Sequence, residues 1–126
     1  MRMSSPARGR VLVIDDEAFI GRGIQRVLAN AHDVDFEVDS ARGLARASSE
    51  RYDVILCDLS MPGMSGIEIY EALTKTAPET AKRMVFLTGG AYTDRATAFL
   101  ESVENVCLEK PVGAATLNRV VKERMR

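Results

Sequence analysis

Residues 11–16 read Val-Leu-Val-Ile-Asp-Asp, four apolar side chains followed directly by two carboxylates. Short runs of mainly apolar, β-branched residues recur along the chain, at Val34–Val38, Val54–Cys57, Met84–Leu87 and Asn105–Leu108. Three of these five runs, including residues 11–14, are almost continuously apolar, which is typical of strands in a parallel sheet that helices cover on both faces. The pattern therefore predicts five short strands.

Between these runs, apolar residues recur with the spacing of amphipathic helices. A clear stripe lies over residues 20–28, a weaker one over 40–50, and further stripes lie over 65–73, 96–103 and 117–125. Ser65 and Glu68 have the spacing of a capping box, and Pro78 is expected beyond the end of that helix. Five alternations of strand and helix predict an α/β fold: a parallel sheet with right-handed crossovers and helices on both faces.

The length and composition indicate one domain. The chain has 126 residues, of which 46% are hydrophobic and 28% are charged. These values are ordinary for a globular domain and exclude a disordered tail, a collagen-like rod and a multidomain enzyme. No Pro-, Gly- or Ser-rich linker divides the sequence. We expect a flexible N-terminal arm, or a remnant of domain excision, over residues 1–9 and one domain over residues 10–126.

The net charge of −1, from 17 basic and 18 acidic residues, gives no overall field that would recruit nucleic acid or anionic lipid. No apolar run approaches the length of a membrane span, and the N-terminus lacks the core of a signal peptide. Cys57 and Cys107 lie far apart inside apolar runs, which predicts free, buried thiols in a reducing cytoplasm. We therefore expect a cytoplasmic protein that binds neither nucleic acid nor membranes.

Polar side chains follow four of the predicted strands. Asp15 and Asp16 follow the first strand, and Asp58 follows the third. Thr88 follows the fourth strand, and Lys110 lies just after the fifth. Ligands of open parallel sheets bind beyond the carboxyl ends of the strands, so we expect these side chains to converge. The two neighbouring aspartates can share a site only if the chain turns where the apolar run stops.

Carboxylates crowded at one edge need a cation among them, and oxygen ligands with room for water suit Mg²⁺. Asp15 and Asp16 would hold this metal. Asp58 stands alone on the middle strand of this edge and is the candidate nucleophile for an aspartyl phosphate. Thr88 and Lys110 supply a hydroxyl and an ammonium suited to the oxygens of a transferring phosphoryl group.

Each of these features alone has a simpler explanation, since an Asp-Asp pair is more often an N-cap, and a lone Asp or a Lys-Pro pair more often belongs to a turn or loop. Their joint occurrence at strand ends favours the functional interpretation. Asp33-Val-Asp35 has the Asp-x-Asp pattern of aspartate-nucleophile phosphatases, but it precedes the second predicted strand, so a surface turn is predicted. His32, the single histidine, is predicted to be a solvated loop residue.

Taken together, the motifs resemble the receiver domain of bacterial two-component response regulators, over essentially residues 10–126. The residues that carry the resemblance are Val11–Asp16, Asp58-Leu-Ser-Met-Pro-Gly-Met-Ser-Gly66, Thr88-Gly89 and Lys110-Pro111. The resemblance implies a flavodoxin-like fold whose five strands lie in the order 2-1-3-4-5. It also implies a phosphoacceptor domain in a phosphorelay, not an enzyme, with only self-phosphorylation and self-dephosphorylation.

The resemblance implies roles for individual residues. Asp58 would receive a phosphoryl group from the phosphohistidine of a histidine kinase or a phosphotransfer domain. Asp16, Asp58 and the backbone carbonyl of Ser60 would hold Mg²⁺, and Asp15 would act mostly through water.

The resemblance further implies that Thr88 and Lys110 contact the phosphoryl oxygens and that Lys110-Pro111 is a cis peptide. Phosphorylation would pull Thr88 inward and alter the surface of the fourth helix, the fifth strand and the fifth helix, where a downstream effector would bind. One position departs from the family. Cys107 lies three residues before the lysine, where the family has a switch aromatic, and a thiol cannot swing between exposed and buried positions as Tyr or Phe would.

Two questions stay open at the level of sequence. The chain is either a stand-alone regulator or a receiver excised from a larger protein such as a hybrid histidine kinase. The alternative function is a pseudo-receiver, an interaction module that keeps the fold without phosphorylation; Cys107 favours it, whereas the three aspartates and Lys110 argue against it. A phosphatase that acts on small substrates is a third hypothesis.

Overall fold

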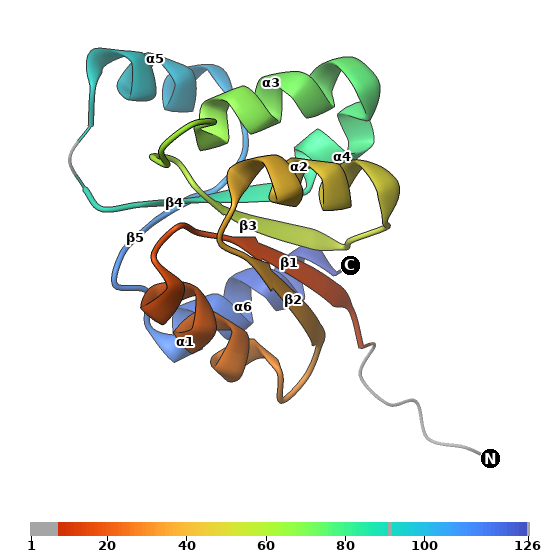
Figure 1. The fold of residues 1–126 in the computed structure, drawn as a ribbon. Coiled ribbons are helices and arrows are strands. Elements are labelled where there is room, and N and C mark those ends of the chain that lie inside the picture. The colour runs from red at the N-terminus through yellow and green to blue at the C-terminus, as the bar shows by residue number, and fades with distance from the viewer. Residues whose placement is uncertain (1–7, 91, 126) are drawn as a thin grey trace.

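The computed structural model describes residues 8–90 and 92–125, and a five-stranded parallel sheet forms its centre (Figure 1). The strands lie in the order β2-β1-β3-β4-β5, which confirms the predicted fold class and strand order. The strands are β1 Arg10–Ile14, β2 Asp33–Glu37, β3 Val54–Asp58, β4 Met84–Thr88 and β5 Cys107–Glu109. The helices are α1 Ala18–Leu28, α2 Ser40–Ser49, α3 Gly66–Thr76, α4 Pro78–Lys82, α5 Asp94–Ser102 and α6 Ala114–Arg124.

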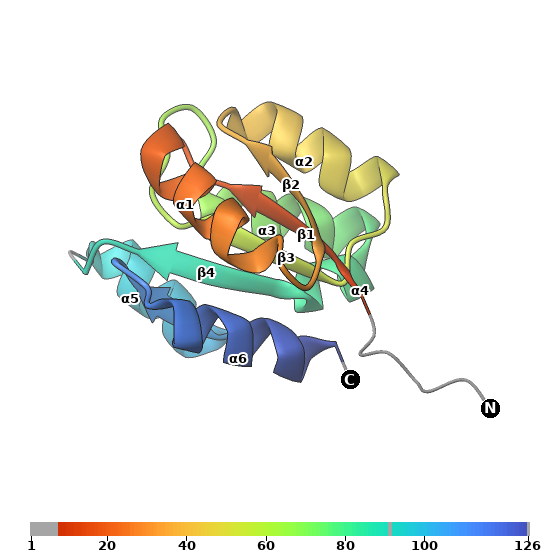
Figure 2. The ribbon, with the colours of Figure 1, turned by 90° about the horizontal axis from the view of Figure 1, so that it is seen from below.

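Helices cover both faces of the sheet, as Figures 1 and 2 show from two directions. Successive residues of a strand point to opposite faces. In β1, Val11 and Val13 pack in a core with α1 and α6, whereas Leu12 and Ile14 pack in a second core with α2, α3, α4 and α5. Both faces are buried from Val11 to Ile14, so each of these four positions must be apolar. This arrangement explains the uninterrupted apolar run that ends at Asp15.

The start of α3 confirms the predicted capping box. Ser65 Oγ accepts a hydrogen bond from Glu68 N at 3.2 Å, and Ser65 N donates to Glu68 Oε1 at 3.0 Å. Pro78 lies beyond the end of α3 as predicted, but it also begins the short helix α4, which the sequence interpretation missed. Proline lacks an N–H that the first helical position does not need, so the same residue can end one helix and start another.

The bounds of some strands differ from the predicted bounds by one or two residues. β5 begins at Cys107 rather than Asn105, because the Asn105 side chain donates to the carbonyls of Ala81 and Met84 at 3.0 and 2.9 Å. These bonds hold the segment before β5 against the end of α4. The prediction of a surface turn over 33–35 is wrong, since these residues form the first three positions of β2.

The prediction that His32 is a solvated loop residue is also wrong. Its side chain is buried, with 7% of the residue exposed, and Nδ1 accepts a hydrogen bond from Gly9 N at 3.2 Å. Arg8 covers the same turn by donating to the carbonyl of His32 and to Asp33 Oδ1. Burial, together with the nearby charge of Arg8, lowers the pKa of His32. Of the predicted arm, residues 1–7 lie outside the described residues, and residues 8 and 9 contact the domain.

Both cysteines are free, as the sequence predicts. Cys57 is buried in the central strand β3, whereas Cys107 is partly exposed because β5 is the edge of the sheet. Within the described parts of the chain, no helix combines the length and the apolar character needed to cross a bilayer.

Arg46 on α2 joins three carboxylates from neighbouring segments. Its guanidinium lies 2.9 Å from Asp35, 3.2 Å from Glu37 and 3.1 Å from Glu50. Arg10 also contacts Asp35 and Glu50, so replacing Arg46 with alanine removes the ion pair of Glu37 and leaves the other two carboxylates with Arg10 between them. We expect the free energy of unfolding to fall by about 1–3 kcal/mol.

Urea denaturation of Arg46→Ala measures this loss. Arg42→Ala on the same helix is the control, because Arg42 is exposed and its own backbone N–H, which the substitution keeps, bonds to the helix cap. Equal stabilities of the two variants would show that the Arg46 ion pairs contribute nothing measurable.

Candidate functional site

The fold brings the predicted site residues to one edge of the sheet. Asp58 and Thr88 are the last residues of β3 and β4, which pair in parallel register, and Asp15 directly follows β1 on the other side of β3. Lys110 directly follows β5. Asp15, Asp58 and Thr88 are buried. These four side chains therefore lie together at the ends of the parallel strands, as expected. Asp16 lies at the exposed rim of the same site.

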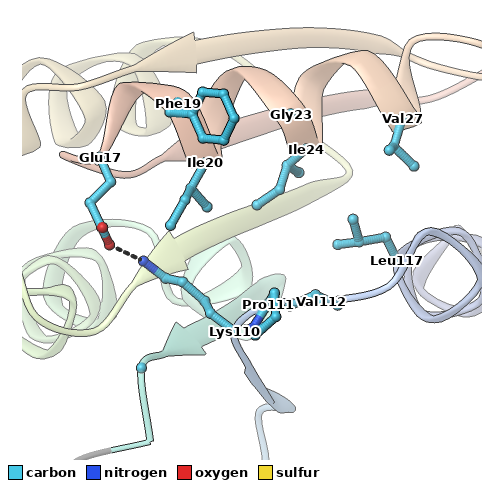
Figure 3. Close-up of a pocket in the computed structure, with 11 residues that line it drawn as sticks. Glu17, Phe19, Ile20, Gly23, Ile24, Val27, Lys110, Pro111, Val112 and Leu117 are labelled. Atoms are coloured by element: carbon cyan, nitrogen blue, oxygen red, sulfur yellow. Dashed lines mark hydrogen bonds and ion pairs between the residues drawn. The ribbon is translucent and has the colours of Figure 1, made fainter.

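Lys110 is the cation of this site. Its Nζ lies 3.1 Å from Asp58 Oδ2, 3.0 Å from Asp15 Oδ2 and 2.9 Å from Glu17 Oε1, and only 8% of its side chain is exposed. Figure 3 shows Lys110 reaching toward Glu17 at the start of α1. Burial alone would lower the pKa of Lys110, but the three carboxylates raise it above its ordinary value. Lys110 is therefore charged at neutral pH.

The two neighbouring aspartates share the site because the chain turns after β1. Asp15 Oδ1 accepts a hydrogen bond from the backbone N–H of Glu17 at 2.9 Å, which turns the backbone toward α1. Carboxylate oxygens of Asp15, Asp16 and Asp58 all lie within 4.8 Å of one another. Three carboxylates at this spacing are a donor set for a hard cation.

A buried oxygen of Asp15 supports this interpretation. Among the described residues, Asp15 Oδ2 is the one buried side-chain oxygen or nitrogen without a hydrogen bond. Lys110 Nζ lies 3.0 Å from this oxygen as an ion pair, and a carboxylate oxygen has room for a further ligand beside it. An unsatisfied buried carboxylate oxygen is costly unless a further ligand completes it. The residues present therefore fit a bound Mg²⁺.

Burial and the neighbouring charge of Asp15 raise the pKa of Asp58 from 3.8 to about 6. The ammonium of Lys110 and the N–H of Ser60 oppose this shift without cancelling it. The N–H of Ser60 donates to Asp58 Oδ1 at 3.3 Å, so Ser60 contacts the acceptor through its amide. The predicted metal contact through its carbonyl stays a prediction.

Two glycines shape the loops around the acceptor. A Cβ at Gly66 would lie 2.4 Å from the carbonyl oxygen of Asp58, so only glycine lets α3 begin so close to the end of β3. Gly90 adopts φ +93° and donates its N–H to Thr88 Oγ1 at 3.2 Å. The hydroxyl of Thr88 is thereby held at the edge beside Asp58's strand.

Comparison with protein families identifies this arrangement. The family model described as the response regulator receiver domain matches residues 11–122. The chain belongs to this family.

Curated relatives agree with the assignment. The receiver domain is 34% identical over 114 residues to an uncharacterised response regulatory protein of Vibrio vulnificus, covering 88% of this chain and 45% of that protein. It is 30% identical over 118 residues to the transcriptional regulatory protein DltR of Streptococcus agalactiae, covering 93% of this chain and 52% of that protein. The chain thus spans about half, or less, of the length of these relatives.

Solved structures show the same fold. A CheY-like receiver domain protein from Methanospirillum hungatei superimposes with a TM-score of 0.83 at 25% identity, covering 94% of each chain. The receiver domain of the sensor histidine kinase PA1611 from Pseudomonas aeruginosa superimposes with a TM-score of 0.82 at 22% identity, covering 94% of this chain and 98% of that one.

The aromatic side chains of this receiver domain pack together at positions other than that of Cys107. Cys107 lies partly buried beside the core on the α3 and α5 face. Phe99 of α5 makes edge contacts with Tyr70 of α3 and Phe86 of β4, both at 5.2 Å between ring centroids. Phe86 lies two residues before Thr88 in β4, so Tyr70 of α3 and Phe99 of α5 supply the aromatic packing next to Thr88. The cis peptide predicted at Lys110-Pro111 is present.

Sequence reasoning missed one member of the site, Glu17. Two carboxylates after the first strand are predicted site residues, and Glu17 follows them directly in Asp15-Asp16-Glu17. Glu17 precedes the first residue of α1, where an acidic residue is usually explained as a helix cap. In the structure its side chain makes no capping hydrogen bond and contacts Lys110 instead.

The raised pKa of Asp58 predicts a pH-dependent stability in metal-free buffer. The folded receiver domain binds the Asp58 proton more tightly than the unfolded chain, so this residue's contribution is favourable at low pH and is lost as pH rises from about 4 to about 7. Asp58→Asn removes the buried charge, and we expect it to stabilise the metal-free domain at neutral pH by about 1–3 kcal/mol.

Urea denaturation of wild type and Asp58→Asn across this pH range, with a chelator present, measures the effect. The difference between the two proteins should grow with rising pH, whereas Asp94→Asn, at the exposed start of α5, should show no such trend. If the difference in stability instead shrinks with rising pH, the charge of Asp58 stabilises the folded domain, and the prediction is wrong.

Proposed function

We propose that this receiver domain accepts a phosphoryl group on Asp58 from the phosphohistidine of a histidine kinase or a phosphotransfer domain. A carboxylate oxygen of Asp58 attacks phosphorus, the P–N bond breaks, and the imidazole leaves with the electron pair. The observation that carries the proposal is the contact of 3.1 Å between Asp58 Oδ2 and Lys110 Nζ at a buried edge of the sheet.

The neighbouring groups support phosphoryl transfer onto Asp58. The ammonium of Lys110 offsets negative charge on the phosphoryl oxygens, and the hydroxyl of Thr88 is available to donate to them. Asp15, Asp16, Asp58 and the carbonyl of Ser60 would hold Mg²⁺. When bound, Mg²⁺ neutralises charge on the transferring group. The Pseudomonas aeruginosa PA1611 receiver domain is described with a magnesium ion coordinated in its active site cleft, which supports the same cofactor here.

We assign the binding of the phosphodonor to a groove beside this site. The groove has a volume of about 520 Å³ and lies between α1 and the segment from Lys110 to α6 (Figure 3). Apolar side chains line most of it, among them Phe19, Ile20 and Leu117, and Lys110 lies at one end. Phe19 is almost fully exposed, so it is available to a partner. A histidine-bearing partner seated here would face the acceptor edge.

The response to phosphorylation is proposed for the surface of α5, β5 and α6, the fourth helix, fifth strand and fifth helix of the sequence prediction. This surface connects to the acceptor through β4 and β5, which pair at Thr88 and Glu109. We further propose residues 10–126 as the receiver unit and residues 1–9 as an arm. The domain acts on no substrate other than its own phosphoryl group, in the cytoplasm, where its free thiols stay reduced.

The pseudo-receiver is the second candidate, because Cys107 replaces an aromatic of the family's switch. Incubation with acetyl phosphate and Mg²⁺, followed by intact mass measurement, separates the candidates. The phosphoacceptor function predicts a gain of one phosphoryl group per chain, and the pseudo-receiver predicts no gain. Release of more than one equivalent of phosphate per chain at a rate typical of enzymes would favour the phosphatase instead.

A further inference from the structure

Glu17 occupies the rim between the acceptor site and the groove. It directly precedes α1, and its carboxylate extends to Lys110 with Oε1 2.9 Å from Nζ. Figure 3 shows this pair at the end of the groove that Ile20 and Phe19 line on the α1 side. A phosphodonor that enters from the groove therefore meets the Glu17–Lys110 pair before it meets Asp58.

Lys110 has three N–H donors, and in the structure one bonds to Glu17 and one to Asp58, while Asp15 lies at ion-pair distance. A phosphoryl group that approaches Asp58 needs the same ammonium for its oxygens. Glu17 therefore competes with the incoming group for Lys110. It also places a negative charge next to an incoming negative charge.

The competition is electrostatic and differs among the carboxylates. Asp15 and Asp58 are buried and belong to the acceptor site itself. Glu17 is 57% exposed on its side chain, so it can turn away into solvent when a phosphoryl group takes its place. Within the described residues, Lys110 is the basic side chain that pairs with Glu17. The cost of displacing Glu17 should thus depend on the charge of the arriving donor.

We propose that Glu17 is a specificity-determining residue that disfavours phosphodonors carrying two negative charges relative to donors of lower net charge. The inference rests on the proposed phosphorylation of Asp58. It adds a selection step at the rim, which keeps dianionic small phosphodonors from using the acceptor freely.

Two small donors of different charge test the inference. Acetyl phosphate is a dianion, whereas phosphoramidate has a protonated nitrogen and a lower net negative charge. With either one, a carboxylate oxygen of Asp58 attacks phosphorus, and acetate or ammonia leaves with the electron pair. We expect Glu17→Gln to speed phosphorylation by acetyl phosphate about 3–10-fold, and to speed phosphorylation by phosphoramidate distinctly less. The ratio of the two initial rates is the readout, measured at saturating Mg²⁺ for each variant.

Two further variants control the experiment. Glu104→Gln removes the same charge from an exposed residue before β5, at the amino ends of the strands and away from the site. It should leave the ratio unchanged. Glu17→Asp keeps the negative charge and should keep a ratio near that of wild type.

A ratio that rises in Glu17→Gln alone supports the inference. An unchanged or lower ratio in Glu17→Gln overturns it while leaving the phosphorylation of Asp58 intact. A rise of equal size in Glu17→Asp or in Glu104→Gln overturns the electrostatic argument. If neither donor phosphorylates the wild-type protein, the inference and the proposed function both fail.

Discussion

Asp58→Asn is expected to abolish phosphoryl incorporation into this receiver domain completely. The substitution keeps the size of the side chain but replaces the nucleophilic carboxylate with an amide, which cannot form an acyl phosphate under these conditions. The neighbouring Asp15 is a poor substitute nucleophile, because it is fully buried and already accepts a hydrogen bond from Glu17 N. Intact mass after incubation with acetyl phosphate and Mg²⁺ measures the result.

The loss must be specific to the acceptor. Asp94→Asn, at the exposed start of α5, makes the same chemical change away from the site and should be phosphorylated like wild type. Because the metal-free Asp58→Asn protein is expected to be at least as stable as wild type, unfolding cannot explain a loss. Full phosphorylation of Asp58→Asn would remove Asp58 from its proposed role.

Lys110→Met is expected to slow phosphorylation by about 10²–10³-fold, the cost typical of removing a principal charge-stabilising donor. The ammonium lies 3.1 Å from Asp58 Oδ2 and pairs with all three carboxylates that surround it, Asp15, Glu17 and Asp58. Methionine preserves much of the side-chain length without the charge. The initial rate with acetyl phosphate at saturating Mg²⁺ is the measurement.

Lys110→Met also leaves the buried carboxylates of Asp15 and Asp58 without their shared cation. We therefore expect the metal-free variant to lose about 3–5 kcal/mol of stability, and Mg²⁺ to restore part of that loss. Lys110→Arg keeps the charge and separates folding from rate, since it should fold well yet remain slower than wild type because its planar fork differs from a point charge. Lys122→Met, on the exposed side of α6, is the control. An unaffected rate in folded Lys110→Met would contradict the role of Lys110.

The sequence predicted the fold because both faces of this sheet are buried. Runs such as 11–14 and 54–57 have to be apolar throughout, which makes them readable as strands, and their ends mark where polar side chains collect. Asp58 and Thr88 follow from this rule, whereas Lys110 follows the partly exposed strand β5. The direction of the Asp15 side chain does not follow from the rule, because it depends on the turn that Glu17 N stabilises.

Other features depend on contacts between segments distant in the sequence. The burial of His32 depends on Arg8 and Gly9, which lie more than 20 residues earlier in the chain. Asp35 lies in the mainly apolar run Val34–Val38 that predicts the second strand, and it pairs with Leu12 of β1. Its carboxylate is held by contacts with Arg10, Arg46 and Tyr52. Neither these contacts nor the burial of His32 has a local signal.

Glu17 illustrates the same limit at the site. Its position before a helix suggests a cap, and only the arrangement of β1 beside β3, with Lys110 reaching across, brings it to the lysine.

Chemical mapping of the phosphorylated residue tests the account most directly. Borohydride reduces an acyl phosphate on aspartate to homoserine, which peptide mass spectrometry then locates in the chain. After treatment with acetyl phosphate and Mg²⁺, we expect homoserine at position 58 and at no other aspartate. Homoserine at position 15 or 16, or its absence in a folded protein that binds Mg²⁺, would contradict this expectation.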